Sequence, residues 1–383
     1  MRLPDLNIQF DFLSGLTLPL IAGILFSFFI AILFLYILIY QGVLRARKKQ
    51  LDRWNTLADS VIYKVIFHED DNPEDNPDGN QTGELLDIIS RTDIQIPKGL
   101  TQHLSNKNFR KILIQKLIAV KLNMSGAASE NLTRLFRQFK FDKQILKMLN
   151  SSSWYKMASA IQQIGIMELD EYKQRLFEFV DHERGLIRIE AQNAILKFYG
   201  FEGLRFLDNA SYPITEWQQI KLLDQLASLH TENFTGIEVW LESKNDTIVL
   251  FALKLVKNYH RFELFDQVVA CLRHNNPIVR QHAIKVLKDL PSEHSAAILI
   301  DIYFSETANN QLAILHALES VSTDAEIPFL LSLLSDDVIA VKIASAKALA
   351  SLGQSGIEAI QSHSASKEYP LAQIVAQILE AAA

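Results

Sequence analysis

The chain has 383 residues, 49% of them hydrophobic, which is enough for several ordinary domains or for one long repeat array. It contains a single cysteine, Cys271, which excludes a fold stabilised by internal disulfides and suits a reducing compartment. Only 14 residues are glycine, a low number that favours packed helices over a loop-rich or sheet-rich fold.

The N-terminal part contains an apolar stretch, Phe12–Leu44, that has no charged residue. Its central part, residues 16–40, is longer than the roughly 20 apolar residues that a helix needs to cross a bilayer. It is also longer than the roughly 7–15 residues of a signal-peptide core, and its basic residues follow it. The pattern predicts a retained single-pass helix in the cell (inner) membrane. Residues 1–15 would form a short tail outside, and the positive flank would stay in the cytoplasm with the C-terminal part.

Small residues recur within this stretch at every fourth position, namely Gly15, Pro19, Gly23, Ser27 and Ala31. Residues four apart lie on one side of a helix, and small side chains let a second helix approach closely in lipid. Small residues are also common in membrane helices for no particular reason. The stripe therefore predicts either a packing face for another membrane helix or an ordinary membrane composition.

Three segments separate the apolar stretch from the rest of the chain. Residues 41–68 predict a basic, amphipathic juxtamembrane helix that lies on the membrane surface or packs on the soluble part. Residues 69–83 carry six acidic residues and two prolines and are expected to be a solvated linker. Residues 84–153 predict an irregular helical region that is strongly basic.

The net charge of −6 hides this basic region. Lys and Arg number 12 against two Asp and Glu in residues 98–156, whereas the numbers are 18 and 29 in residues 157–383. The basic residues form either a solvated helical face or a surface for anionic lipid of the inner leaflet. No groove-reading motif points to nucleic acid as a partner. The candidate lipid contacts are Lys107, Arg110, Lys111, Lys116, Arg134 and Arg137.

A repeat occupies residues 154–383. One apolar position recurs at intervals of 30 or 31 residues, at Ile164, Ile195, Leu226, Val256, Leu287, Leu318, Leu349 and Leu379. Each unit divides into two short helices, and such a pair cannot bury its own apolar face. Stacked pairs share one continuous core, so the sequence predicts an all-α fold with an α-solenoid of antiparallel helix pairs.

Two segments show the repeat most clearly: LLSLLSDDVIAVKIASAKALASLG (Leu330–Gly353) and CLRHNNPIVRQHAIKVLKDL (Cys271–Leu290). They resemble the HEAT/armadillo-like superfamily, in particular short bacterial HEAT-like repeats. The resemblance implies that a basic residue early in each second helix bonds to a turn carboxylate of a neighbouring repeat. Arg188, Arg280 and Lys342 hold that position, whereas Val249 and Gln311 interrupt the ladder.

No pattern in the sequence predicts catalysis, a metal site or a cofactor. The ten histidines are dispersed, and no zinc spacing, phosphate loop or dinucleotide glycine pattern is present. Cys271 is expected to be a packing residue. We therefore predict a protein that is not an enzyme and that binds another protein.

Two functional hypotheses follow. The first is a membrane-anchored scaffold or adaptor, such as a regulatory subunit of a membrane complex, that presents a cytoplasmic solenoid to a partner. The second is suggested by HEAT-like proteins that resemble chromophore lyases, in which the groove holds a tetrapyrrole or another small molecule. For the first, the second helices would line the groove, with contacts at solvent-facing positions near Gln192, Lys221, Lys254, Lys285 and His316.

Overall fold

The computed structural model describes residues 7–67, 100–227, 234–290, 292–363 and 371–382, and the linker expected at residues 69–83 lies outside them. The described residues are helical and contain no strand, which confirms the all-α prediction. The chain divides into two compact units, Met1–Lys147 and Met148–Ala383. Each unit is described by itself.

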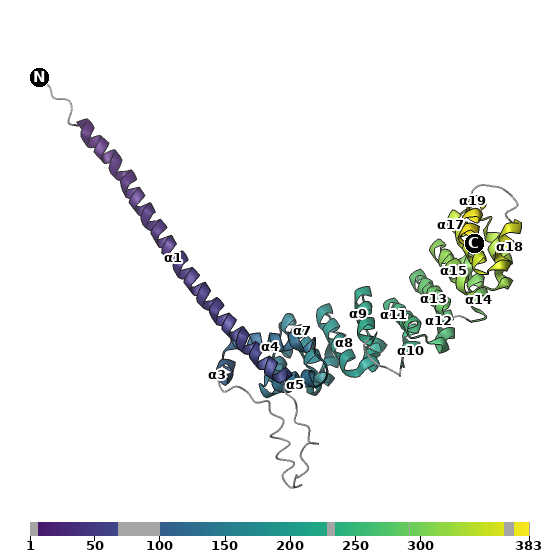
Figure 1. Cartoon of the computed structure of the whole chain (residues 1–383), viewed down its shortest axis with the longest axis horizontal. Helices are drawn as coiled ribbons and strands as arrows, with labels where there is room; N and C mark the ends of the chain where they lie inside the picture. The colour runs from purple at the N-terminus through teal and green to yellow at the C-terminus, as the bar shows by residue number, and fades with distance from the viewer. Residues whose placement is uncertain (1–6, 68–99, 228–233, 291, 364–370, 383) are drawn as a thin grey trace, which may run out of the picture. The chain divides into compact units, whose positions relative to one another are not determined.

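The first unit is built on one uninterrupted helix, α1 (Asn7–Ile66) (Figure 1). It begins within the expected tail and runs through both the apolar stretch and the juxtamembrane segment. The other helices of this unit are α3 (Leu100–Leu104), α4 (Lys107–Lys121) and α5 (Gly126–Gln138), and α6 (Phe141–Leu149) contains the boundary with the second unit. Within the helical region expected at residues 84–153, residues 84–99 lie outside the described part, and the rest contains α3 to α6.

The two halves of α1 have different surroundings. Large apolar side chains between Leu20 and Leu44 are 43–66% exposed. Further along, Trp54, Val61 and Val65 are buried, because α4 and α5 pack on this half. Trp54 meets the ring of Phe109 edge-on at 6.2 Å between centroids, so the juxtamembrane helix packs on the soluble part of its own unit.

The second unit consists of helical pairs in two layers. The second member of each pair is α7 (Trp154–Met167), α8 (Gly185–Tyr199), α9 (Glu216–Ala227), α11 (Asp246–Asn258), α13 (Pro277–Asp289), α15 (Ala308–Val321), α17 (Ile339–Ser351) or α19 (Leu371–Ala382). The first members that follow α6 are the 3₁₀ helices η2 (Asp170–Phe179) and η3 (Gly200–Asn209), then α10 (Ile237–Leu241), α12 (Phe265–Cys271), α14 (Ser295–Ile302), α16 (Ile327–Leu333) and α18 (Gln354–His363). Short 3₁₀ turns, η4 (Phe262–Leu264), η5 (Tyr303–Ser305) and η6 (Asp324–Glu326), flank α12, α14 and α16.

Two of the second helices, α11 and α13, begin with asparagine caps. The side chains of Asn245 and Asn276 accept hydrogen bonds from the amides of Thr247 (3.1 Å) and Ile278 (2.9 Å). These bonds satisfy amides that have no partner inside the helix. Pro277 follows its cap at the first helical position, where a missing N–H costs nothing.

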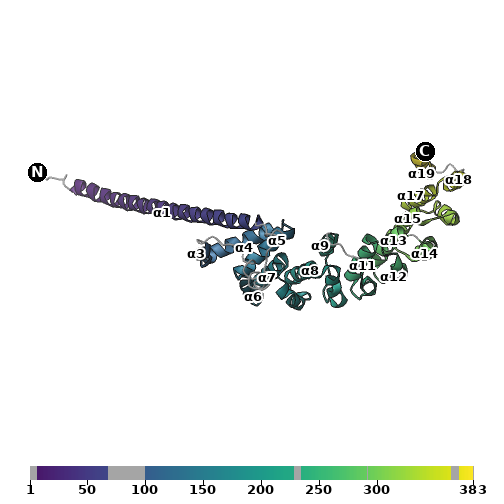
Figure 2. The same ribbon diagram turned by 60° about the horizontal axis from the view of Figure 1, so that its bottom comes forward.

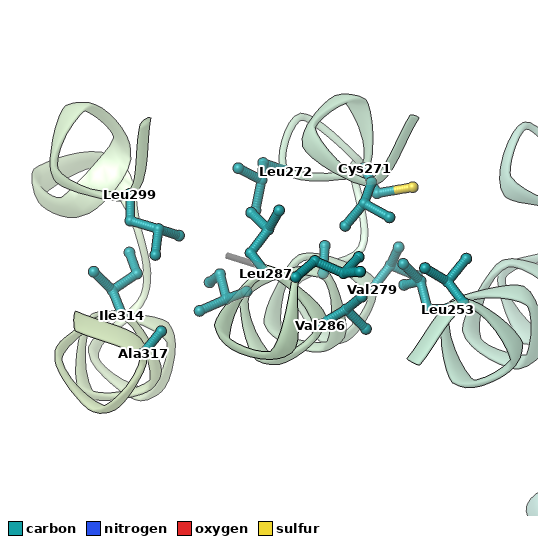
Figure 3. Packing of buried hydrophobic residues seen from close by; sticks show 14 of the residues in the cluster. Leu253, Cys271, Leu272, Val279, Val286, Leu287, Leu299, Ile314 and Ala317 are labelled. Carbon is teal, nitrogen blue, oxygen red and sulfur yellow. The ribbon is translucent and has the colours of Figure 1, made fainter. Parts of the chain in front are cut away.

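The recurring apolar position forms the centre of the core. From Ile164 to Leu349, its seven described side chains are at most 1% exposed, and the side chain of Leu379 lies outside the described part. α13 packs on α11 and α15, and α15 packs on α17 (Figures 1 and 2). Figure 3 shows Leu287 pointing toward Leu272 of the same pair, and Leu299 and Ile314 pointing toward each other in the next. One apolar cluster runs from Leu196 of α8 to Ile378 of α19, so the pairs along this part share one interior.

The closest approach of α7 and α8 depends on Gly165. A Cβ atom at this position would lie 2.9 Å from Ala194 Cβ. We expect Gly165→Ala to lower the free energy of unfolding by about 1 kcal/mol, because overpacking outweighs the better helix propensity of alanine. Urea unfolding followed by circular dichroism measures this loss. Adding Ala194→Gly to Gly165→Ala should restore part of the lost free energy of unfolding. If the losses of the two single variants simply add in the double variant, the strain does not arise from contact between these two residues.

Candidate functional site

The candidate site is the solvent side of the second helices. Each residue of a helix turns by about 100°, so the residue two before the recurring core position lies roughly opposite the core. In chain order this position holds Gln162, Asn193, Asp224, Lys254, Lys285, His316 and Lys347. The last four, on α11, α13, α15 and α17, are called the basic row below.

The side chains of the basic row reach solvent and have few acidic partners. Lys254 is half-buried and its Nζ donates to Gln219 Oε1 at 2.9 Å, while the exposed Lys285 donates to Gln281 Oε1 at 3.3 Å. His316 is exposed and lies 2.9 Å from Glu319 Oε1. Lys347 is exposed and forms no ion pair with any residue that the structure describes. Three lysines of the row therefore lack a carboxylate partner among the described residues.

The charge of this row affects the pKa of His282. Burial lowers the pKa of its imidazole, and the nearby ammonium groups of Lys285 and Lys254 lower it further. A hydrogen bond to the carbonyl of Ile278 and the more distant carboxylate of Glu216 act in the opposite direction without reversing the shift. The lysines of α11 and α13 therefore act on one common region.

A second row of exposed residues lies nine positions before the core position, on the same side of the helices. Tyr155, Leu186 and Trp217 are 57%, 47% and 59% exposed on α7, α8 and α9. We call these three the apolar row. Ile220 follows Trp217 by one helical turn and is 57% exposed, and Lys221 places its Nζ 5.6 Å from the centre of the Trp217 ring. The solvent side thus carries the apolar row along α7 to α9 and the basic row along α11 to α17, where Ile278 of α13, in the register of the apolar row, is also 54% exposed.

The structure corrects one of the predicted groove positions. Gln192 is 2% exposed rather than solvent-facing, because it lies three residues before the core position and so on the core side of α8. Its Nε2 donates to the carbonyl of Val180 at 2.8 Å, and its Oε1 accepts from Gln218. Asn193 holds the outward position instead. Lys221, Lys254, Lys285 and His316 lie on the solvent side, and Lys347 was missed although the same register contains it.

Neighbouring pairs are joined by polar bonds, only some of which come from the predicted ladder. Arg280 forms two bonds with Glu306, Nε to Oε1 at 2.6 Å and Nη2 to Oε2 at 3.0 Å, and the Glu306 side chain is 3% exposed. Arg188 instead donates to the carbonyl of His182 and lies 4.2 Å from the ring of Tyr212. Lys342 has no ion pair among the described residues.

Residues outside the predicted ladder contribute further bonds between pairs. Asn276 Nδ2 donates to Asp246 Oδ2 at 2.7 Å, and the indole N–H of Trp240 donates to Asp208 at 2.7 Å. Gln311 does not bridge pairs but donates to the carbonyl of Tyr303 at 3.1 Å. The ladder is therefore a mixed set of side-chain bonds rather than a repeated arginine–aspartate pair.

The basic region of the first unit is only partly exposed. Lys107 and Lys111 on α4 and Arg137 on α5 are exposed, as a lipid contact requires. Lys116 pairs with Asp59 of α1, and Arg110 is half-buried. Arg134 is half-buried as well. Because Arg110 and Arg134 are half-buried, they are less accessible to lipid than Lys107, Lys111 and Arg137.

The small-residue stripe lies on the exposed half of α1. Gly23, Ser27 and Ala31 are exposed, so these positions are accessible to another helix. Gly15 and Pro19 belong to the α1 backbone, but their side chains lie outside the described part. The stripe as a packing face stays a prediction.

The described part of the chain contains a buried thiol and an open hollow. Among the described residues, no group of three or more His, Cys, Asp or Glu side chains is placed to hold a metal ion. Burial, with a smaller contribution from Glu242, raises the pKa of Cys271 to about 11, so this thiol is protonated at neutral pH. An open hollow of about 570 Å³ is lined by Leu223, Ala227, Lys257, Asn258, Tyr259, His260 and Asp289, in which Lys257 and Asp289 pair at 2.8 Å.

Comparison with known proteins supports the repeat resemblance. The family model of the HEAT repeat matches residues 327–356, which include α16 and α17. No curated protein matches the chain significantly.

Several solved structures are similar at low identity. An engineered protein is 14% identical, with 72% of this chain and 90% of that chain covered and a TM-score of 0.34. Human deoxyhypusine hydroxylase is 12% identical, with 86% and 97% covered and a TM-score of 0.28. A microtubule polymerase with Tumor Overexpressed Gene domain arrays, which recruits and assembles tubulin, is 13% identical, with 88% and 87% covered and a TM-score of 0.23. These values carry no argument about function. The second unit is a stack of helical repeats that resembles HEAT repeats.

Proposed function

We propose that the protein is a membrane-anchored scaffold that binds another protein on the solvent side of its second helices. In this role it would act as an adaptor or a regulatory subunit of a membrane complex. A stack of helical pairs offers a long, rigid surface, and such surfaces suit partner binding. The proposal gives the chain a binding role and assigns no catalytic residue.

The observation that carries the membrane part of the proposal is the contrast between the two halves of α1. The most hydrophobic 18-residue window of this helix has a mean hydropathy of 2.8, and none of it is buried. A core helix of a soluble protein would bury such a window, and water would make its exposure costly. A hydrocarbon environment would remove that cost. In the packed half of the same helix, Trp54 is only 8% exposed. This half would connect the membrane-spanning half to the other helices of the first unit.

The orientation follows from the charges that border the exposed half. Four basic residues come directly after it and are all exposed: Arg45, Arg47, Lys48 and Lys49. Cytoplasmic flanks are rich in such residues, which supports a single-pass helix in the cell (inner) membrane with the C-terminal part in the cytoplasm. Each exposed cation near anionic headgroups would add about 1 kcal/mol, and Lys107, Lys111 and Arg137 are further candidates.

We expect the membrane-bound fraction to depend mainly on the exposed half of α1. The variant Leu33→Asp/Ile37→Asp places two carboxylates in that half, each costing about 2.5–3.5 kcal/mol in a bilayer. It should be extracted from membranes by alkaline carbonate, whereas the parent chain should stay in the pellet. The matched variant Tyr63→Asp/Phe67→Asp changes two exposed aromatic residues near the other end of α1 and should stay bound.

The mass of a C-terminally tagged chain and its protease accessibility complete the test. An intact chain whose tag is digested only in inverted vesicles supports the proposed topology. A shortened chain that starts beyond residue 44 would identify a cleaved signal sequence and contradict the anchor. Crosslinking in intact membranes, compared with a chain lacking residues 1–44, then identifies the protein that is bound.

A further inference from the structure

The basic row lies in the second unit, in which acidic residues outnumber basic ones. Residues 157–383 contain 18 Lys and Arg against 29 Asp and Glu. On α11, α13, α15 and α17 the balance is reversed, with seven Lys and Arg against three Asp and Glu. The first helices α10, α12, α14 and α16 carry no Lys or Arg and three acidic residues, and most other acidic residues of this region lie in turns, as Asp336 does. Lys and Arg are thus concentrated on the second helices.

The positive charge of the three lysines of the row is available to a ligand, whereas His316 lies 2.9 Å from Glu319 Oε1. Arg280 and Lys257 have carboxylate partners, Glu306 and Asp289, but they lie off the row. Within the row, Lys254 and Lys285 donate only to neutral glutamine oxygens. Four cationic or titratable groups at equivalent positions of four packed helices therefore form one strip, a single side chain wide.

We infer that the basic row binds an extended acidic segment of a partner protein, with a carboxylate at every third residue and apolar residues at the end that lies over Trp217 and Ile220. The inference rests on the proposed function and names the chemistry of the partner.

The spacing of the row selects the segment. Packed helices lie about 8–10 Å apart, so successive cations of the row have a similar separation. A polyproline II chain rises about 3.1 Å per residue and repeats every third residue, so carboxylates three residues apart point the same way at about 9.3 Å. A β-strand would turn every third side chain to the opposite face. In an acidic chain of the polyproline II form, the carboxylates at every third residue therefore have the same spacing as the side chains of the row.

The width of the row and its end exclude broader ligands. The helices of the row also carry Asp246, Asp289 and Glu319, which would repel a wide polyanion such as duplex nucleic acid. At the other end, the bond from Lys254 to Gln219 joins the row to α9, which carries Trp217 and Ile220. These two side chains are 59% and 57% exposed and offer apolar contact to the end of the segment.

The test uses the full chain in detergent and fluorescent peptides of equal composition. In one peptide, four glutamates are spaced by two neutral residues and followed by two leucines; in the other, the four glutamates are contiguous. The spaced peptide should bind at least about tenfold tighter, and 0.5 M salt should weaken its binding. Equal binding of the two peptides would overturn the inference.

Variants locate the site. Lys285→Gln/Lys347→Gln should weaken binding of the spaced peptide by about 5–20-fold, since each exposed ion pair contributes a factor of about 2–5. The control Lys173→Gln/Lys244→Gln removes two lysines outside the row and should change binding less than twofold. Trp217→Ala should weaken binding of the spaced peptide, and it should not change binding of a third peptide in which serines replace the two leucines.

Two further results would overturn the inference. One is binding of a single-stranded oligonucleotide that depends on the row while the peptides do not bind. The other is capture of a partner in intact membranes that is unchanged in Lys285→Gln/Lys347→Gln, which would leave the proposed scaffold role standing without this site. Loss of membrane retention in the parent chain would contradict the anchor instead and can be distinguished from both.

Discussion

Replacing Trp240 with alanine should lower the free energy of unfolding of the second unit by about 3–5 kcal/mol. The side chain is 1% exposed and lies 5.9 Å from the ring of Phe201, between centroids. Its indole N–H donates to Asp208 one pair earlier, so alanine would leave both a cavity and a lost hydrogen bond. Because each pair contacts only its neighbours, the loss should spread from α10 to η3 and α11.

Hydrogen exchange of individual peptides is the measurement, with Trp217→Ala as the matched control. Trp217 is 59% exposed, so its removal should change the free energy of opening by less than about 0.5 kcal/mol. Faster exchange in η3, α10 and α11 is expected for Trp240→Ala only. Similar exchange in the two variants would mean that Trp240 does not hold these pairs together.

Replacing Glu306 with alanine should cost about 3–5 kcal/mol, because it leaves the guanidinium of Arg280 without its carboxylate. Glu306 also accepts from Asn310 Nδ2 at 2.9 Å, so one carboxylate joins α13 to the start of α15. The exposed pair of Lys173 and Asp170 is the control, and Asp170→Ala should cost less than about 1 kcal/mol. A loss for Glu306→Ala that is no larger than the control would contradict a structural role for the pair.

The same pair predicts a pH dependence. Burial raises the pKa of Glu306, but hydrogen bonds from Arg280 and Asn310, the charge of Arg280 and the amide of Thr307 together outweigh it and lower the pKa below the ordinary value of 4.5. A carboxyl whose pKa is lower in the folded chain stabilises it above the unfolded pKa, and this contribution is lost as the pH falls through the folded pKa. The difference between Glu306→Ala and the parent should therefore be largest near pH 7 and shrink below about pH 4.

The repeat could be predicted from sequence because burial imposes a period on it. The positions from Ile164 to Leu349 are apolar for one reason, contact with a neighbouring pair, and that contact recurs with every unit. The apolar row could have been found in the same way, since Tyr155, Leu186 and Trp217 are spaced by one repeat. Its exposure, however, depends on how the pairs stack.

Other features depend on contacts between residues far apart in the sequence. The pattern of Trp54, Val61 and Val65 indicates a buried face, but it does not say that α4 and α5 cover it. Gln192 is polar and was assigned to the solvent side, yet a buried amide pair with Gln218 satisfies it on the core side. A shift of one residue, to Asn193, separates the two sides of α8.

The continuity of α1 has a mechanical consequence for a chain held in a bilayer as we propose. A helix of 60 residues is about 90 Å long, and the structure shows no interruption between its exposed and its packed half. A continuous helix of this length transmits a change of tilt from one end to the other. A partner that changes the tilt of the exposed half would therefore rotate the Trp54 end, together with α4 and α5, without a hinge to absorb the motion.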